Sequence, residues 1–72
     1  MDFIHLMINS GTEGSAEFFI YDVSGKSISL TKQFIHSGVN EIKLDAQSFS
    51  KGIYFVRTVL RKETKVSKAL VE

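Results

Sequence analysis

The sequence predicts an all-β fold, namely a small immunoglobulin-like antiparallel β-sandwich of six to seven strands. Apolar and polar residues alternate with a period of two through most of the 72 residues, as half-buried strands require. Turn residues interrupt this alternation about every ten residues, which is typical of a sandwich or barrel. No window shows the period of an amphipathic helix.

The first half of the chain contains three alternating segments joined by turns. Residues 4–8 alternate and end at the polar turn 9–14, and residues 16–21 form the second strand. The following Asp22-Val23-Ser24-Gly25 predicts a type I turn with a left-handed bulge at the glycine. Residues 28–34 return from this turn, with their isoleucine and leucine expected to face the core.

The second half begins after a turn at residues 36–38. Residues 40–45 alternate as a strand with one polar face. The segment 46–51 is too short for a stable α-helix, so it predicts a single turn whose Phe49 plugs the end of the core. Residues 53–60 are apolar or aromatic on both faces, interrupted only by Arg57 and Thr58, which predicts a central strand covered on both sides.

A charged hairpin tip at residues 61–63 leads to the last strand, which ends at Val71. The inward residues of all these strands are expected to form one core between two sheets. The predicted core consists of Ile4, Leu6, Ile8, Phe18, Ile20, Ile28, Leu30, Ile42, Leu44, Phe49, Tyr54, Val56 and Leu70.

Composition restricts the function. A chain of 72 residues forms a single domain at most, residues 1–72, and a net charge of +1 does not suit a dedicated nucleic-acid surface. No cysteine is present to form a disulfide, and no apolar run approaches the length of about 18 residues that spans a membrane. Because Met1 is followed directly by strand-like residues, we expect an excised fragment of a larger protein.

No motif in the sequence is complete enough to indicate catalytic or cofactor chemistry. Gly25-Lys26-Ser27 resembles the end of a phosphate-binding loop, but Ile20 stands where that loop needs glycine. Ser48-Phe49-Ser50-Lys51 matches a serine nucleophile motif without its partner motifs. His5 and His36 alone are too few for a zinc site, which takes three or four protein ligands. We therefore expect no enzyme activity, no metal and no cofactor.

Three aromatic residues of the second and fifth strands, Phe19, Tyr21 and Phe55, have two interpretations. They line an exposed patch for carbohydrate or protein, or they cover a second sheet face, which we favour. The exposed patch is consistent with an immunoglobulin- or fibronectin-like accessory module that binds carbohydrate or protein. Fold alone does not decide the function.

Several segments carry a family resemblance in the right order. Asp2-Phe3-Ile4 opens the pattern, and an apolar–Tyr–Asp–x–x–Gly–Lys hairpin follows at 20–26. An Asn–x–apolar–x–apolar–Asp strand at 40–45 leads to Gly52-Ile53-Tyr54-Phe55-Val56, and Lys68-Ala69-Leu70-Val71-Glu72 ends the chain. The chain thus resembles the C-terminal sorting domain of proteins exported by the type IX (Por) secretion system of Bacteroidetes.

Two departures from the family pattern stand out. The family's usual Tyr–Pro–Asn–Pro-type opening is absent, and Phe49 stands where the family usually has leucine. The missing opening removes an edge strand from the family's seven-stranded form.

The resemblance implies a secretion signal that catalyses nothing. The type IX outer-membrane translocon would recognise the folded domain in the periplasm, and a sortase-like protease would remove it. The parent protein would then be secreted or held at the cell surface, and exposed strand edges would permit a homodimer. The recognition residues implied by the resemblance are Gly52, Tyr54, Val56, Lys65, Lys68, Leu70 and Val71.

Overall fold

A computed structural model describes residues 3–72, which form six strands and no helix. Every paired strand is antiparallel to its neighbour, which confirms the predicted all-β class. The strands are β1 (Phe3–Ser10), β2 (Gly14–Asp22), β3 (Ser27–Ile35), β4 (Gly38–Asp45), β5 (Gly52–Leu60) and β6 (Glu63–Val71).

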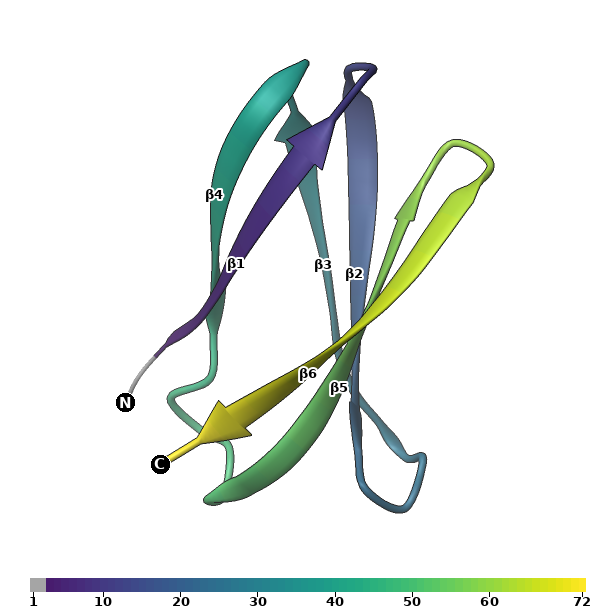
Figure 1. Cartoon of the computed structure of the whole chain (residues 1–72). Helices are drawn as coiled ribbons and strands as arrows, with labels where there is room; N and C mark the ends of the chain where they lie inside the picture. The colour runs from purple at the N-terminus through teal and green to yellow at the C-terminus, as the bar shows by residue number, and fades with distance from the viewer. Residues whose placement is uncertain (1–2) are drawn as a thin grey trace.

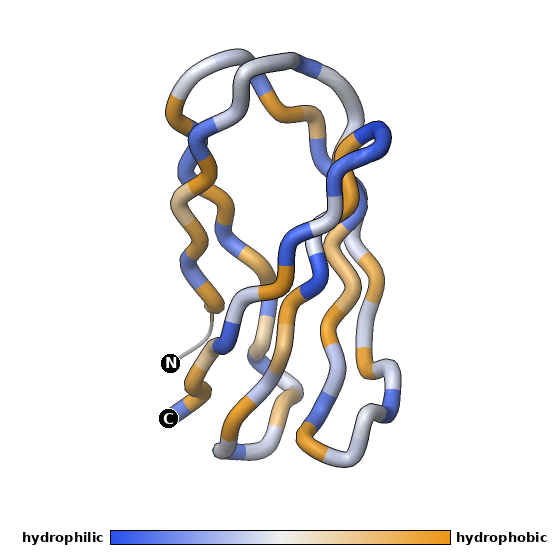
Figure 2. The backbone as a smooth tube through the Cα atoms, turned by 45° about the vertical axis from the view of Figure 1, so that its right-hand side comes forward, coloured by the Kyte–Doolittle hydropathy of each residue, from blue (hydrophilic) through white to orange (hydrophobic). Residues whose placement is uncertain are grey.

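The strands form two sheets that face each other as a sandwich-like arrangement (Figure 1). One sheet contains only β1 and β4, and the other has the order β3-β2-β5-β6. Figure 2 shows orange and blue residues alternating along the strands, which is the period-two pattern that predicted them. The chain crosses from one sheet to the other after β1, β3 and β4, so strands that follow each other in sequence are divided between the two layers.

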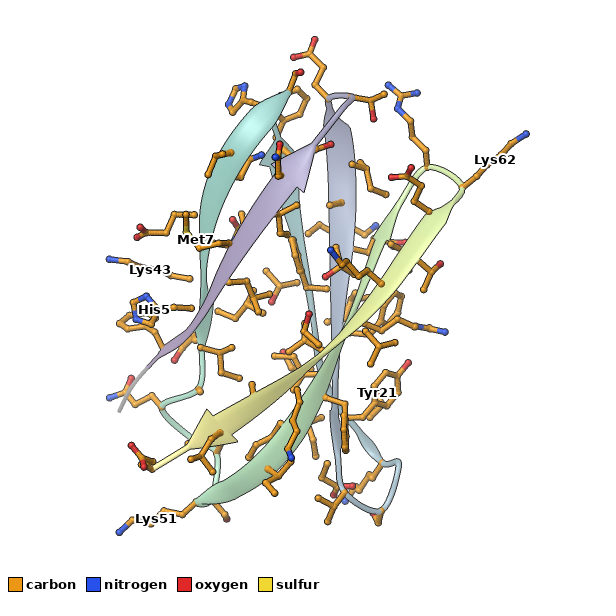
Figure 3. The ribbon with its side chains drawn as sticks, in the orientation of Figure 1. His5, Met7, Tyr21, Lys43, Lys51 and Lys62 are labelled. Carbon is orange, nitrogen blue, oxygen red and sulfur yellow. The ribbon has the colours of Figure 1, made fainter. Side chains whose placement is uncertain are left out.

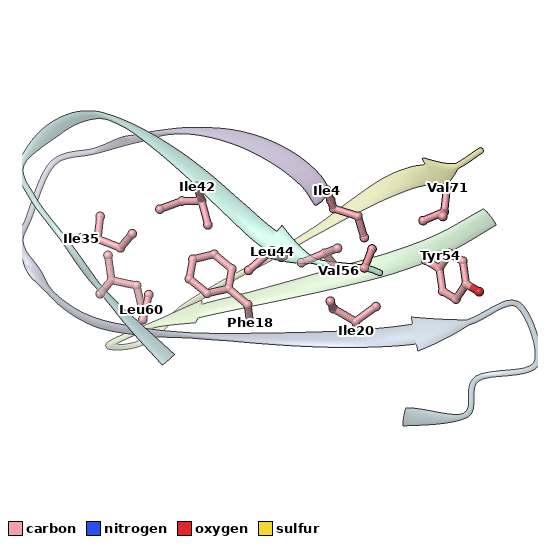
Figure 4. Packing of buried hydrophobic residues seen from close by; sticks show 12 residues of the cluster. Ile4, Phe18, Ile20, Ile35, Ile42, Leu44, Tyr54, Val56, Leu60 and Val71 are labelled. Carbon is pink, nitrogen blue, oxygen red and sulfur yellow. The ribbon is translucent and has the colours of Figure 1, made fainter. Parts of the chain in front are cut away.

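The core lies between the two sheets (Figure 4). Phe18, Ile20 and Val56 are fully buried on the four-stranded sheet, and Ile42 and Leu44 meet them from β4. Most of the predicted core is confirmed. Buried as expected are Ile4, Phe18, Ile20, Ile42, Leu44, Tyr54 and Val56, while Leu6, Ile8 and Phe49 pack against them partly buried.

The orientation predicted for β3 is wrong. Ile28 is 38% exposed and Leu30 is 50% exposed, although both were expected in the core. Leu30 lies directly opposite Phe19, and Thr31 lies opposite Phe18. Because opposite residues of an antiparallel pair point to the same face, the burial of Phe18 turns Thr31 inward and Leu30 outward.

The orientation predicted for Leu70 is also wrong, because its side chain is 57% exposed and its neighbour Val71 is buried instead. Leu70 lies opposite Ile53, which points away from the core. The outward side of β5 is not covered either, since Ile53 is 38% exposed and Phe55 is 37% exposed. β5 is central in its sheet, as predicted, but only its inward side is buried.

The turn between β2 and β3 has the predicted geometry. The Gly25 N–H donates to the Asp22 carbonyl oxygen over 3.0 Å, and Gly25 has a left-handed φ of 87°. One carboxylate oxygen of Asp22, Oδ1, accepts hydrogen bonds from the Ser24 hydroxyl at 2.6 Å and from the backbone N–H groups of Ser24 and Lys26 at 2.9 and 3.0 Å. These bonds, the Ser24 hydroxyl foremost, lower the pKa of Asp22.

The connection between β4 and β5 closes one end of the core. The Phe49 N–H donates to the Ala46 carbonyl at 3.0 Å, which makes a single turn as predicted. The Phe49 ring lies 5.1 Å from the Tyr54 ring, measured between centroids. The Tyr54 hydroxyl donates to the Ser50 carbonyl over 2.6 Å, so a buried strand residue ties down the connection that precedes it.

Replacing Tyr54 with phenylalanine should lower the free energy of unfolding by about 1 kcal/mol, because the Ser50 carbonyl loses its donor while the ring stays packed. Urea denaturation followed by circular dichroism measures this difference. Tyr21→Phe is the matched control, since no hydrogen bond holds the Tyr21 hydroxyl among residues 3–72. Equal losses in the two variants would contradict the assignment.

The lowered pKa of Asp22 predicts a pH-dependent contribution to stability. A carboxyl whose pKa is lower in the folded than in the unfolded state stabilises above its unfolded pKa of about 3.9. That stabilisation is lost as the pH falls through the folded pKa. Asp22→Asn keeps an acceptor oxygen but removes the charge. The difference in unfolding free energy between wild type and variant should therefore be largest above about pH 5 and shrink below about pH 4. A constant difference across this range would refute the prediction.

Candidate functional site

The groups considered for catalysis do not assemble into a site. Residues 3–72 contain no group of three or more His, Cys, Asp or Glu that could hold a metal ion. His5 lies exposed on β1 and points away from the interior (Figure 3). His36 follows β3, where its ring packs edge-on against Phe34 at 5.0 Å. Lys26 sits in a hairpin turn followed by a strand, so no helix terminus faces it for phosphate binding. In the described part of the chain, no helix is long and apolar enough to cross a membrane.

A cleft of about 170 Å³ opens between β1 and the β5–β6 hairpin. Leu6, Ile8 and Leu60 line it with apolar surface, and Glu63 and Lys65 lie at its border. The cleft marks where the two sheets diverge.

A second hollow lies between β3 and the β4–β5 connection, and Asp22 and Asp45 border it. Both carboxylates hold turns, since Asp22 accepts the bonds described above and the Asp45 Oδ1 accepts the Gln47 N–H at 3.0 Å. Their hydrogen bonds therefore assign them a structural role at this end of the sandwich.

Three of the residues implied by the family resemblance are in the core. Tyr54 is 7% exposed, Val56 is fully buried, and Val71 is 4% exposed. Gly52 begins β5 opposite Val71 with a φ of 152°, a conformation that residues with a side chain rarely adopt. These four residues shape and hold β5 and β6 from the inside.

The other three, Lys65, Lys68 and Leu70, are exposed on β6, an edge strand of the larger sheet. They do not share one face. Lys68 lies opposite Phe55, and Leu70 lies opposite Ile53, so both point outward from the sandwich. Lys65 lies opposite Thr58 and borders the cleft on the inner side.

Sequence reasoning did not recognise the outward side of the four-stranded sheet as a continuous exposed surface, which we call the outer face. Tyr21 points away from the interior on this side of the molecule (Figure 3). Its large exposed apolar residues are Leu30, Phe34, Ile53, Phe55, Val66 and Leu70. The three aromatic residues singled out in the sequence therefore lie on a second sheet face, but no element of residues 3–72 covers that face.

Arg57 lies in the middle of the outer face and was read in the sequence only as an interruption. The central carbon of its guanidinium lies 4.6 Å from the centre of the Phe19 ring and 5.7 Å from that of Tyr21. This cation–π contact holds the guanidinium next to the two aromatic rings. A lone cation within an apolar strand was the signal that could have identified it.

The family comparison agrees with the lack of an assembled catalytic centre among residues 3–72. A family model described as the secretion system C-terminal sorting domain matches residues 2–72. Neither the curated proteins nor the solved structures yielded a match. The family is non-catalytic and is recognised by the type IX secretion machinery, which exports the parent protein across the outer membrane to the medium or the cell surface. The chain belongs to this family of type IX sorting domains, and its function is to direct the export of a parent protein.

Proposed function

We propose that this chain is a single sorting domain of a larger exported protein, and that the type IX outer-membrane translocon recognises it already folded in the periplasm. The observation that carries this proposal is the exposure of Lys68 and Leu70 beside a buried Val71. The same strand thus contributes to the core and presents side chains outward. Such a strand offers its contact residues only when the sandwich is formed.

Within this proposal, the implied recognition residues have two different roles. Tyr54, Val56 and Val71 act indirectly, because their burial sets the position of β5 and β6. Gly52 acts through its backbone conformation at the start of β5. Lys65, Lys68 and Leu70 make the contacts with the translocon.

We further propose that a sortase-like protease removes the domain after translocation, as the family membership suggests. The free edges of β1, β3, β4 and β6 also leave backbone groups open to strand addition, which supports pairing with a second copy. The family match favours sorting over an accessory module that binds carbohydrate or protein.

Substituting the exposed β6 residues should block export without unfolding the domain. In a reporter fusion expressed in a host with the type IX system, the double variant Lys68→Glu and Leu70→Ser should leave the reporter in the periplasm. Both side chains are exposed, so the unfolding midpoint should stay near that of the wild type. The measurement is the fraction of reporter in the medium.

The matched control changes the same residue types on the other sheet, with Lys43→Glu and Val39→Ser on β4, both exposed. These substitutions should leave export intact. Deleting residues 68–72 is a poorer test because it also removes Val71 from the core. Unchanged export of the β6 variant, or equal loss in the β4 variant, would refute the contact assignment.

A further inference from the structure

We infer that the outer face is a docking surface for an acidic, apolar protein surface, and that Arg57 anchors the contact. The inference rests on the proposed recognition by the translocon and names the chemistry of the partner. It adds residues of β2, β3 and β5 that the family resemblance did not imply.

The register of three strand pairs places the outer-face residues in rows across the sheet. Opposite residues on antiparallel strands point to the same face, so each row forms one continuous strip. The central row is Leu30, Phe19, Arg57 and Val66, and the next contains Tyr21, Phe55 and Lys68. Arginine and aromatic residues at the middle of a patch, framed by apolar neighbours, are typical of protein interface centres.

Arg57 is held in place, but one of its polar atoms has no partner among residues 3–72. Its Nε is buried without a hydrogen-bond partner, and no carboxylate of residues 3–72 forms an ion pair with its guanidinium. Stacking on Phe19 and Tyr21 fixes the side chain before any partner binds. The terminal N–H groups then form a preorganised fork, and a planar carboxylate accepts two hydrogen bonds from such a fork.

The charges of the outer face require an anionic partner. Glu17 pairs with Lys32 at 3.9 Å, and among residues 3–72 no carboxylate forms an ion pair with Arg57 or Lys68. A second copy packed on this face around a two-fold axis would bring equal positive charges together near its centre. Like charges facing each other disfavour such a complex. The outer face therefore fits a partner with carboxylates among apolar side chains better than it fits itself.

The outer face is large enough for a specific contact. Its four strands have nine residues each, which corresponds to a length of roughly 30 Å, and its outermost strands are roughly 14 Å apart. When each of the four strands is given its full spacing of about 4.8 Å, the face covers roughly 570 Å². This is close to the lower limit of specific interfaces, about 600 Å² on each partner. Apolar area of this kind on a monomer marks an interaction site.

The test measures binding of the folded domain to the purified, detergent-solubilised type IX translocon. Arg57→Met keeps the apolar stem but removes the charge and the fork, and should raise Kd about tenfold or more. Raising the salt concentration should weaken wild-type binding more than binding of this variant, because only the wild type has the central charge pair.

A second variant leaves Arg57 in place. Val66 lies opposite Arg57 and is 62% exposed, so Val66→Glu supplies a carboxylate within the chain that competes with the partner. It should weaken binding to a similar extent. Val39→Glu on β4 adds the same charge at a residue that is 68% exposed, and should leave Kd within about twofold.

The possible results separate this inference from the proposed function. If the wild type neither binds the translocon nor exports a reporter, the proposed function fails. If it does both and the Arg57 and Val66 variants match it, only the docking surface is overturned. The wild type could also bind anionic phosphatidylglycerol vesicles. If Arg57→Met abolishes this binding and leaves translocon binding unchanged, the occupant of the outer face is a lipid surface and the inference of a protein partner is overturned. If the wild type forms a dimer that Val66→Glu abolishes, and translocon binding is unchanged, the occupant of the outer face is a second copy of the chain and the inference is overturned.

Discussion

The antiparallel register around β2 is the constraint on which the rest of the molecule depends. β2 lies between β3 and β5, and its inward side chains Phe18 and Ile20 are fully buried. Once they face the core, the residues opposite them on both neighbours must face it too. Val56 of β5 gains a place in the core in this way, while Ser29 of β3 is turned inward although it is polar.

This constraint explains why a small domain exposes so much apolar surface. Each strand of the larger sheet has two sides, but the two-stranded sheet β1–β4 covers only one of them. The apolar residues on the other side, with Phe55 among them, remain accessible to solvent. Burial inside the sandwich holds the fold together, whereas the uncovered side exposes apolar and charged side chains to solvent. Core residues and exposed residues therefore alternate along the same strands.

Much of the fold was predictable from local patterns. The Asp22 to Gly25 turn follows from an aspartate and a glycine at the positions that such a turn requires. The face of β3 was not predictable, because a period of two shows which residues lie together but not which set points inward. The set of β3 residues that contains Leu30 is the more apolar one, but the pairing of Leu30 with Phe19 turns this set outward. Leu70 and Val71 are adjacent and both apolar, so alternation did not distinguish them.

The functional surface was harder to predict than the fold. The sorting function came from a resemblance spread over the whole chain, since no reactive cluster marks it. Lys68 and Leu70 were named from the resemblance and are exposed, whereas the environment of Arg57 depends on contacts across strands. Its partners Phe19 and Tyr21 are distant in sequence, and only the β2–β5 register brings them together.

The inward side of β3 is polar, which affects how the sandwich opens. Ser29, Thr31 and Gln33 place polar groups where β2 and β5 place hydrocarbon, and the Gln33 amide reaches the Lys43 carbonyl only at 3.5 Å. Apolar burial therefore adds little to the attachment of this edge strand until Ile35 near its end. Under thermal agitation or mechanical pull, β3 would therefore separate from the sandwich along residues 29–33 more easily than at Ile35.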